Sequence, residues 1–461
     1  MSRVDKSAPL GVGEEALQSF RNRLRGQVIL PGDDSYDDAR RIWNAMVDKR
    51  PALIVRCAGV SDVIDGIEFA QVNGLRAAVR GGGHNIAGNA LCDGGLVIDL
   101  SPMKSVRVEP GARRVRAEPG VVWGEFDRET QMFGLATTGG VVSTTGIAGL
   151  TLGGGVGWLH AMYGLSADNL ISADVILADG RLLTAREDEN EDLFWALRGG
   201  GGNFGVVTSF EYRLHPLDKV LAGPVFHPAE RAFDVLRFYR DFIATLPDEL
   251  SVYAGFLTDP EGNGLIGLVS CYVGPVEEGE RLVRPVREFG PPVADMVAPI
   301  PYTALQTMFD GAFPPGRQNY WKSGFLADLS DEALRIVVDY AAAMPSPTSM
   351  VMIENYHGAY SRVGPSETPY NNRDAHYDLL ILASWADPAE SDKNVGWARS
   401  FYEAVRPYLA DKAFPNLMGQ DEIEDRDRQA YGANSARLTE VKSKYDPTDF
   451  FRPNLNVKPS G

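Results

Sequence analysis

The residues best suited to chemistry in this chain lie at positions 79–85, where three consecutive glycines stand between Arg80 and His84. Because glycines carry no side chains, backbone N–H groups in such a run can approach an anionic ligand closely. The arginine adds positive charge before the glycines, and the histidine adds an imidazole after them. This combination predicts a loop that holds a diphosphate-containing cofactor, with His84 near the reactive ring of that cofactor.

Two common nucleotide-binding motifs do not fit the glycine-rich segments. No Gly-Lys-Ser or Gly-Lys-Thr follows the first run, so this run is not a P-loop. Downstream, Gly200, Gly202 and Gly205 match the spacing G-x-G-x-x-G. Residues 206–212 after them have the composition of a strand, whereas a dinucleotide-binding fold needs a helix there. A triple glycine alone also occurs in ordinary tight turns, so its interpretation depends on the rest of the chain.

The elements expected to position the first run are a helix and two strands. Ser61 is a suitable N-cap, apolar residues then recur at near-helical spacing, and Gly74 is a suitable stop. We therefore expect a helix at 61–74, with short strands at 76–79 and 95–100 on either side of the loop. We also expect a helix at 13–25, a hairpin at 174–184 that turns at Asp179-Gly180, and a helix at 191–198.

The pattern of the chain changes after His215-Pro216, where long helical patterns begin to alternate with strand-like runs. The expected helices are 231–246, 277–289, 331–343 and 391–408, and the expected strands are 250–257, 265–273, 350–356 and 377–385. This alternation predicts one antiparallel sheet with helices on one face. Such a sheet would form the roof of a substrate cavity.

Composition indicates a large globular protein with an acidic surface. A chain of 461 residues with 44% hydrophobic content can bury an extensive core and should form at least two domains. The net charge of −17 disfavours nucleic acid and anionic membranes as partners, because both require a basic face. No apolar run reaches the length of a membrane span, and the N-terminal segment lacks the apolar core of a signal peptide. We therefore expect a cytoplasmic protein.

The three cysteines, Cys57, Cys92 and Cys271, are too few and too scattered for a disulfide framework or a zinc site. We expect all three to be reduced and mostly buried, and we expect no bound metal. The sequence leaves the oligomeric state open between a monomer and a homodimer.

Several further motifs follow the first glycine run in a characteristic order. They lie at residues 138–146, 152–158, 163–165, 168–170, 199–205, 444–447 and 451–456. Together with the first run, they resemble the FAD-linked oxidoreductases of the vanillyl-alcohol-oxidase superfamily. The resemblance is to the berberine-bridge-enzyme-like group, and within it to the bacterial members whose flavin is linked to one histidine. It is strong over residues 40–217 and 375–459 and covers the middle of the chain only in outline.

The resemblance implies an α+β fold with two domains. A two-lobed FAD-binding domain of the PCMH type would occupy residues 1–217, with its core at about 40–217. A substrate-binding domain, built as an antiparallel sheet covered by helices, would occupy 218–415, and residues 416–461 would return to the FAD domain.

The family motifs also assign residues to the FAD site. They are Arg80, Gly81, Gly82, Gly83, His84, Asn85, Gly88, Gly139, Gly140, Val142, Ser143, Thr144, Gly146, Gly149, Gly153, Gly154, Gly157, Trp158, Asn169, Gly205, Val206, Val207, Asn454 and Asn456. The two C-terminal asparagines, with Arg452, would donate hydrogen bonds to the flavin carbonyls, where reduction builds negative charge.

The resemblance implies that His84 bonds covalently to the 8α-methyl group of the flavin. A neutral imidazole can attack the electrophilic tautomer that forms when this methyl group loses a proton. The alternative is a histidine that serves only in hydrogen bonding or packing. Many plant and fungal relatives add a second bond from a cysteine eleven positions before Gly153 in this numbering. Val142 stands at that position, so a single link is expected.

The residue thought to control oxygen access in this family lies three positions after the missing cysteine, and here it is Thr145. Threonine is nearly isosteric with the valine common in oxidases, which favours molecular oxygen over another electron acceptor. The alternative is an ordinary turn threonine.

The usual catalytic base of the family is not found at its expected place. Many sugar and alcohol oxidases of the group have a Tyr-x-Asn motif, which matches Phe414-Pro415-Asn416 here, and Leu380 replaces a polar residue common on the preceding strand. Alcohol oxidation without a base is slow, whereas the lone pair of a neutral amine can expel a hydride unaided. A small amine or alkaloid-like substrate, oxidised by hydride transfer to flavin N5, is therefore favoured. An alcohol or oligosaccharide oxidase, or a FAD-binding protein with vestigial activity, is the alternative.

The candidate substrate-facing residues lie on the expected strand at 350–356. Alternation places Glu354 and Tyr356 on one side of this strand and His357 on the other. A carboxylate on the cavity side could hold a cationic amine or accept a proton, while a solvated or salt-bridged sheet residue is the alternative. With Asn416 to position the substrate and Thr145 beside the flavin, these two residues complete the predicted catalytic set.

Overall fold

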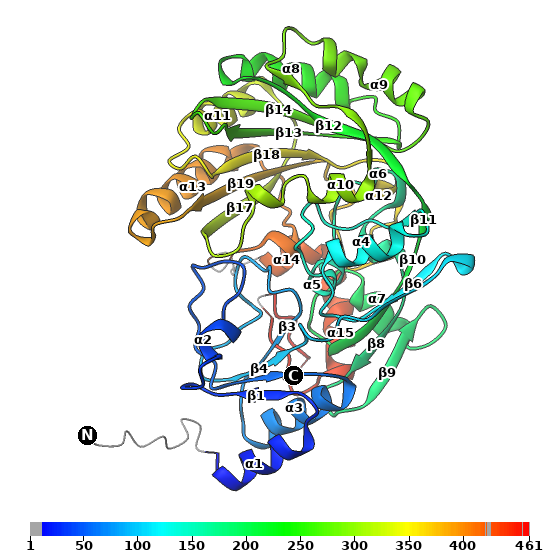
Figure 1. Cartoon of the computed structure of the whole chain (residues 1–461), viewed down its shortest axis with the longest axis vertical. Helices are drawn as coiled ribbons and strands as arrows, with labels where there is room; N and C mark the ends of the chain where they lie inside the picture. Colours follow the sequence, from blue (N-terminus) through cyan, green and yellow to red (C-terminus); the bar gives the residue numbers. More distant parts are fainter. Residues whose placement is uncertain (1–11, 420, 422–425, 454, 461) are drawn as a thin grey trace.

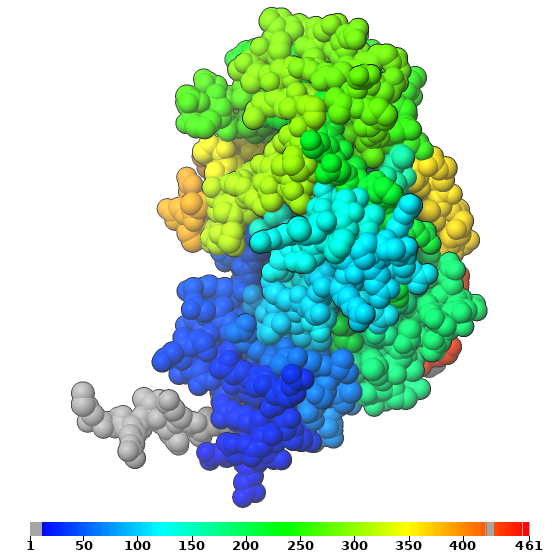
Figure 2. Space-filling view, turned by 45° about the vertical axis from the view of Figure 1, so that its right-hand side comes forward, coloured from blue at the N-terminus to red at the C-terminus, as the bar shows by residue number. Residues whose placement is uncertain are grey.

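The computed structural model describes residues 12–419, 421, 426–453 and 455–460 of the chain. In this part of the chain, strands form three larger sheets and one short pair, and helices lie against the sheets. Figure 1 shows the first sheet at the base in blue, the second beside it in cyan and green, and the largest above them. The space-filling view in Figure 2 shows the same order on the surface, with the cyan region between the blue base and the green roof. The predicted α+β class is confirmed.

A four-stranded sheet near the N-terminus carries the first glycine run. Its elements are α1 (Glu14–Arg23), β1 (Gln27–Ile29), α2 (Tyr36–Ala39), β2 (Leu53–Arg56), α3 (Val60–Val72), β3 (Ala77–Arg80) and β4 (Leu96–Asp99). The strand order is β1-β2-β4-β3, with β2 and β3 both parallel to β4. Parallel strands need a crossover, which α3 supplies between β2 and β3. The glycine run starts where β3 ends, so the loop leaves the sheet at the carboxyl edge of its parallel strands.

A five-stranded antiparallel sheet and its helices carry the second glycine-rich region. The elements are β5 (Val106–Glu109), β6 (Arg114–Ala117), α4 (Trp123–Gln131), β7 (Leu135–Ala136), α5 (Ile147–Leu152), α6 (His160–Tyr163), β8 (Leu170–Ile176), β9 (Leu182–Arg186), α7 (Glu191–Leu197), β10 (Val206–Arg213) and β11 (His215–Pro216). The strand order is β5-β6-β10-β8-β9, and β7 pairs with β11 separately. The predicted hairpin is β8–β9, and Gly180 in its turn has a φ of +81°, a conformation that glycine adopts without strain.

The largest sheet forms the roof of the molecule. Its strands and helices are β12 (Lys219–Pro228), α8 (Ala232–Ile243), β13 (Leu250–Thr258), β14 (Gly264–Tyr272), α9 (Val276–Glu288), β15 (Ala294–Asp295), β16 (Ala298–Pro301), α10 (Tyr302–Thr307), β17 (Gln318–Leu326), α11 (Asp331–Ala342), β18 (Met350–Asn355), α12 (Ala359–Arg362), β19 (Tyr377–Trp385) and α13 (Ser391–Val405). The order is β15-β12-β14-β13-β18-β19-β17, all neighbours are antiparallel, and β16 also pairs with β12.

The two faces of the roof sheet differ in what covers them. The helices α8, α9, α11 and α13 cover one face and enclose the largest hydrophobic core, which contains Val351 and Ile353 of β18. Because side chains alternate along a strand, the intervening Met352 points to the opposite face, where Leu380 and Leu382 of β19 join it. On that opposite face, α6 and α10 pack near β13 and β12, whereas the face of β18 and β19 looks toward the first two sheets (Figure 1). It is the side of the sheet available to a ligand.

Two long strands of the roof were not predicted. The strand β12 contains Gly223 and Pro224, two residue types that argue against a central strand. The strand β17 mixes polar and apolar residues without clear alternation and lies at the edge of the sheet. Both strands are held by pairing with a neighbour along most of their length, which a local sequence pattern does not reveal.

The C-terminal segment packs against the second sheet region, where α15 (Ser435–Tyr445) lies on α7 and α14 (Arg426–Tyr431) precedes it. Lys442 of α15 is fully buried and forms an ion pair of 2.7 Å with the equally buried Asp446. Its Nζ also donates to the carbonyl oxygens of Asn203 and Phe451. This one ammonium group therefore links α15, the loop before β10 and the chain end.

Replacing Lys442 with alanine should destabilise the fold strongly, because the buried carboxylate of Asp446 would lose its cation. Breaking such a buried pair typically costs about 3–5 kcal/mol. The matched control is Lys444→Ala, which removes an ion pair between Asp192 and a lysine side chain that is 59% exposed. Exposed pairs contribute roughly 0–1 kcal/mol. Guanidinium unfolding followed by tryptophan fluorescence measures both variants, and equal shifts in midpoint would contradict the buried role of Lys442.

Candidate active site

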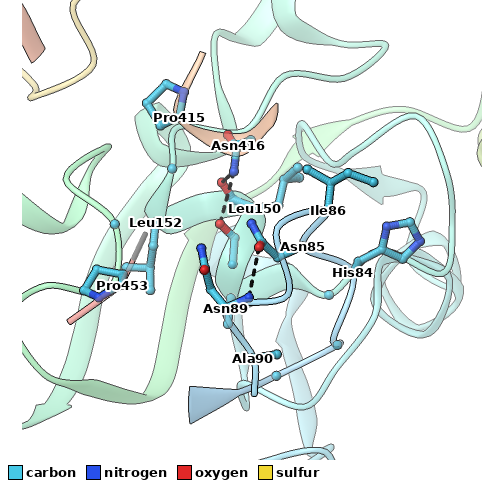
Figure 3. Close-up of a pocket in the computed structure, with 18 of the residues that line it drawn as sticks. His84, Asn85, Ile86, Asn89, Ala90, Leu150, Leu152, Pro415, Asn416 and Pro453 are labelled. Carbon is cyan, nitrogen blue, oxygen red and sulfur yellow. Dashed lines mark hydrogen bonds between the residues drawn. The ribbon is translucent and has the colours of Figure 1, made fainter. Parts of the chain in front are cut away.

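A cavity of about 390 Å³ lies between the roof sheet and the two lower sheets. Its wall comes from the loop after β3, the segment around α5, the loop before β10, the bare face of β18 and β19, and the C-terminal segment. Figure 3 shows His84, Asn85 and Ile86 on one part of this wall, and Asn416 beside Leu150 on another. One cavity therefore collects residues that are far apart in the sequence.

The two glycine-rich regions meet backbone to backbone at the floor of this cavity. A Cβ atom added to Gly82 would lie 2.6 Å from Cα of Gly146, and one added to Gly146 would lie 2.7 Å from Cα of Gly82. A Cβ atom on Gly81 would lie 2.9 Å from the carbonyl oxygen of Pro119. No side chain fits between these segments. The loops thus offer an extended backbone surface that suits a cofactor with a diphosphate group.

His84 lies on the wall with its ring fixed from two directions. Its Nε2 atom is 3.2 Å from the hydroxyl oxygen of Thr144, and its ring stacks on Trp43 with centroids 4.4 Å apart. Burial lowers the pKa of the imidazole to about 4. His84 is therefore neutral near pH 7, which is the state in which an imidazole is a nucleophile.

Positive charge lines the cavity near the first sheet. Lys49, Arg76 and Arg452 all contribute to the wall. The ammonium group of Lys49 donates to the carbonyl oxygens of Gly88 and Leu91, and burial lowers its pKa. In a chain of net charge −17, this concentration of cations fits an anionic group of the cofactor.

Asn416 joins the C-terminal segment to the end of α5. Its amide nitrogen lies 3.2 and 3.1 Å from the carbonyl oxygens of Gly149 and Leu150, and its Oδ1 accepts a hydrogen bond from the backbone N–H of Gly155 (Figure 3). A Cβ atom on Gly153 would collide with this side chain at 2.4 Å. Asn416 thus lines the cavity but uses its polar atoms to close the helix end, which makes it a positioning residue.

The roof presents one charged side chain to the cavity. Met352, Leu380 and Leu382 supply apolar surface, and Glu354 stands among them, 4% exposed. The hydroxyl of Tyr356 donates to Glu354 Oε2 at 2.6 Å. Burial raises the pKa of the Glu354 carboxyl to about 7, and this hydrogen bond opposes the shift.

Many residues that the family motifs assign to FAD line this cavity. They are Gly81, Gly82, Gly83, His84, Asn85, Gly140, Val142, Gly146, Gly149, Gly153, Gly205, Val206 and Val207. From the predicted catalytic set, the cavity is lined by Glu354, Asn416 and Thr145. The structure thus brings the main predicted segments together.

Other predicted residues within the described structure do not line the cavity. They are Arg80, Gly88, Gly139, Ser143, Thr144, Gly154, Gly157, Trp158, Asn169, Tyr356 and Asn456. Arg80 donates to the carbonyl oxygen of Ala39 at 2.6 Å, so its guanidinium braces the loop. Gly157 packs so tightly that an added Cβ atom would lie 1.6 Å from the carbonyl oxygen of Gly139. Asn454 lies outside the described residues.

Three of these supporting residues have clear partners. Ser143 donates from both its backbone N–H and its hydroxyl to Asp310 of the roof region, which anchors the second glycine-rich loop. Trp158 is buried and stacks on Tyr253, with centroids 5.1 Å apart. Asn169 donates from its amide to two nearby backbone carbonyls. Each holds the shape of the site and makes no direct contribution to the cavity wall.

Sequence reasoning missed several residues of the site. Trp43, Lys49 and Arg76 lie outside the glycine motifs, and Trp321 comes from a strand that was not predicted. Asp378 was also missed, although it lies directly opposite Glu354 in the pairing of β18 with β19. Its position could have been found only from the register of two strands more than twenty residues apart in the sequence.

Comparison with known proteins also indicates an FAD site in this part of the chain. A family model described as an FAD binding domain matches residues 51–186, and one described as berberine and berberine like matches residues 413–458. The (R)-6-hydroxynicotine oxidase of Paenarthrobacter nicotinovorans is 33% identical over 95% of this chain and 98% of its own length. This chain belongs to the berberine-bridge-enzyme-like FAD-linked oxidoreductases.

Solved structures of similar proteins have the same fold. The crystal structure of 6-hydroxy-D-nicotine oxidase from Arthrobacter nicotinovorans matches with a TM-score of 0.87 at 30% identity, over 95% of this chain and 98% of that one. A chitooligosaccharide oxidase matches with a TM-score of 0.84 at 24% identity, over 97% and 100% of the two chains, which shows the fold alone. The predicted family and FAD-dependent oxidoreductase activity are confirmed. Within the described ranges, no helix has both the length and the apolar character to cross a bilayer.

Gly82→Ala should reduce FAD binding, because its methyl group would push apart the two loops that form the floor. Overpacking of this kind costs roughly 1–3 kcal/mol, so we expect affinity to fall by about tenfold. The control is Gly396→Ala in α13, where no atom lies within 4 Å of the added Cβ. The measurement is the ratio of flavin to protein absorbance after purification and dialysis, made in a His84→Ala background so that no covalent bond retains the flavin. Equal flavin content in both variants would contradict the contact between the loops.

Proposed function

We propose that this oxidoreductase holds FAD through one covalent bond to His84 and oxidises a small amine or alkaloid-like substrate. The proposed substrate class rests on the roof of the cavity, where Glu354 is the charged side chain in a largely apolar surface. An apolar wall with one buried carboxylate favours a ligand that has a hydrocarbon body and one positive charge. A curated relative and a solved structure, both named for hydroxynicotine oxidation, support this class.

The residues of the cavity fit FAD. The close-packed glycines offer backbone to a diphosphate, and Lys49, Arg76 and Arg452 offer positive charge. When bound, FAD supplies the acceptor for the two electrons that leave the substrate as a hydride. The contact of His84 Nε2 with Thr144 orients the ring on the cavity wall.

Glu354 is placed to control the proton and the position of an amine. With a pKa raised to about 7, the carboxyl is substantially ionised at neutral pH and can bind a substrate ammonium. It can also accept the proton that the ammonium must lose, since a nitrogen lone pair is needed to expel the hydride. Phe414 packs against Tyr356 and Tyr370, so the position that would carry a tyrosine base is part of an apolar cluster.

An oligosaccharide oxidase is the second candidate, because a chitooligosaccharide oxidase has the same fold. A sugar carries many hydroxyl groups, and each one that is buried without a partner costs about 1–3 kcal/mol. The apolar residues Met352, Leu380 and Leu382 offer few such partners. A vestigial FAD-binding protein is the remaining alternative, and the ionisable, cavity-facing Glu354 argues against it.

The remaining features of the proposal rest on individual residues and on the composition of the chain. Val142 at the place of the second family anchor supports a single flavin link, and Thr145 on the cavity wall supports molecular oxygen as the electron acceptor. Three cysteines that are free and buried support a cytoplasmic location. We further propose that the protein is a monomer or a homodimer that binds neither nucleic acid nor a membrane, in keeping with its acidic charge.

The covalent link predicts that acid-precipitated protein stays yellow and that the flavin-bearing peptide contains His84 and no cysteine. His84→Ala should still bind FAD, because the glycine loops are unchanged, but it should release the flavin on precipitation. The control His357→Ala, whose ring contacts the carbonyl oxygen of Leu250, should keep its colour in the pellet. A colourless pellet from the wild-type protein would refute the covalent bond.

Glu354→Gln tests the substrate class. The half-saturating concentration for a panel of cyclic amines should rise at least about tenfold, because the substrate ammonium loses its counter-charge, while the limiting rate of flavin reduction should change less. The control is Glu332→Gln, an exposed residue of α11 on the far side of the sheet. Stopped-flow reduction with amine and sugar panels gives both quantities. Rapid reduction by simple sugars, with no reaction of amines, would support the oligosaccharide alternative.

A further inference from the structure

A second buried carboxyl lies beside Glu354. Glu354 of β18 and Asp378 of β19 are direct partners in the antiparallel pairing of the two strands. The hydroxyl oxygen of Tyr356 is 2.6 Å from Glu354 Oε2 and 3.2 Å from Asp378 Oδ2. One phenol thus bridges two carboxyl groups that belong to neighbouring strands.

The hydrogen bonds of this trio limit how many protons it can hold. A tyrosine hydroxyl carries one proton, so it can donate to one carboxylate and must accept from the other group. Two ionised carboxylates would leave one of the two contacts without a proton and would repel each other in a site of low polarity. The trio therefore needs one additional proton, located on one of the two carboxyl groups.

We propose that Asp378 is the protonated member of the trio and donates to Tyr356, which in turn donates to an ionised Glu354. Asp378 is then a positioning residue: it keeps the phenol proton directed at Glu354 and leaves the site with one negative charge. The inference that this negative charge binds a cationic ligand rests on the proposed function, whereas the location of the proton does not.

Burial distinguishes the two carboxyl groups. Asp378 is 0% exposed, and its Oδ1 atom has no hydrogen-bond partner among the described residues, an arrangement that suits a neutral carboxyl better than an anion. Glu354 reaches the cavity, where substrate and water can meet its second oxygen. Burial, and secondarily the charge of Glu354, raises the pKa of Asp378 well above its ordinary value, whereas Glu354 is raised only to about 7.

The groups around the trio are neutral near pH 7. Tyr239 of α8, Tyr253 of β13 and Tyr360 of α12 are buried phenols, and burial raises the pKa of each. His160 of α6 contacts Tyr356 edge to face, and burial lowers its pKa to about 3. Tyr370 is a further buried phenol with a raised pKa.

The cation near these phenols is already paired. The guanidinium of Arg373 lies over the rings of Tyr360 and Tyr370, and it forms a two-pronged ion pair with Asp168. Phe325 of β17, which pairs with Asp378, adds only apolar surface. The proton on Asp378 therefore lowers the negative charge of the trio.

The position of the phenol is set by the backbone. Tyr356 follows the last residue of β18, and its N–H donates to the carbonyl oxygen of His376 at 2.8 Å. The Nδ1 atom of His376 lies 2.8 Å from the carbonyl oxygen of Tyr356 and must donate, because a carbonyl oxygen only accepts. The backbone bond continues the pairing of β18 with β19, and the side-chain bond reinforces it, so the hydroxyl stays between the two carboxyl groups.

Infrared spectra of the resting holoenzyme, compared between the wild-type protein and each variant, test where the proton lies. At about pH 8.5, Glu354 and the buried Asp127 should be ionised, because burial raises the pKa of each only to about 7. A protonated-carboxyl band in the wild-type protein at this pH should therefore come from Asp378. Asp378→Asn should remove that band and Glu354→Gln should keep it. Tyr356→Phe should shift its frequency, because the carboxyl loses its acceptor. A band that survives in Asp378→Asn and disappears in Glu354→Gln would overturn the assignment.

Binding of benzyltrimethylammonium, a cation whose charge does not titrate, tests which carboxyl carries the charge. In the wild-type protein its dissociation constant should rise by about tenfold per unit as pH falls below 7, because Glu354 takes up a proton. Asp378→Asn should keep this dependence, since an amide donor replaces the neutral acid, whereas Glu354→Gln should bind weakly at every pH. Weak binding by Asp378→Asn with normal binding by Glu354→Gln would assign the charge to Asp378 and refute the inference.

The two measurements separate the inference from the proposed function. If no ammonium ion binds to any variant but the infrared band behaves as expected, the amine proposal fails and the proton on Asp378 stands. If the cation binds through Glu354 but Asp378→Asn leaves the band unchanged, the amine proposal stands and the inference fails.

Discussion

The close contact between Gly82 and Gly146 is the constraint on which the rest of the site depends. The two residues belong to loops from different sheets, and their backbones approach so closely that neither position has room for a Cβ atom. This contact joins the two lower sheets into one floor and leaves backbone groups to face the cofactor. Ser143, near the same contact, then ties this floor to the roof through Asp310. The cavity exists because these loops pack without side chains.

The roof adds a buried carboxyl to the cavity, which the proposed function uses to discriminate between substrates. Alternation along β18 buries Val351 and Ile353 under helices and turns Met352 and Glu354 toward the cavity. A carboxyl in such surroundings is held in balance between ionised and neutral forms, because burial opposes its charge and the Tyr356 hydroxyl favours it. In the proposed function, floor and roof therefore divide the chemistry, since the first binds the cofactor and the second selects the substrate.

The predictable part of the fold consists of segments with strong local patterns. The helix α3, the hairpin β8–β9 and the strands β13, β14, β18 and β19 were all expected close to their observed positions. The strands β12 and β17 were missed because pairing with neighbours, and not local composition, makes them strands. In the site, the glycine motifs placed His84 on the cavity wall, but the same motifs gave no indication of Trp43, which stacks on it.

The sequence by itself determined the family, the FAD-binding segments and the presence of a carboxylate at position 354, because these depend on residue types at short spacings. Only the tertiary structure showed that Arg80 braces a loop while Lys49 and Arg76 face the cavity. It also placed Asp378 opposite Glu354. The physical reason is that a side chain's direction and its partners follow from strand register and packing between distant segments, and no local pattern encodes either of these.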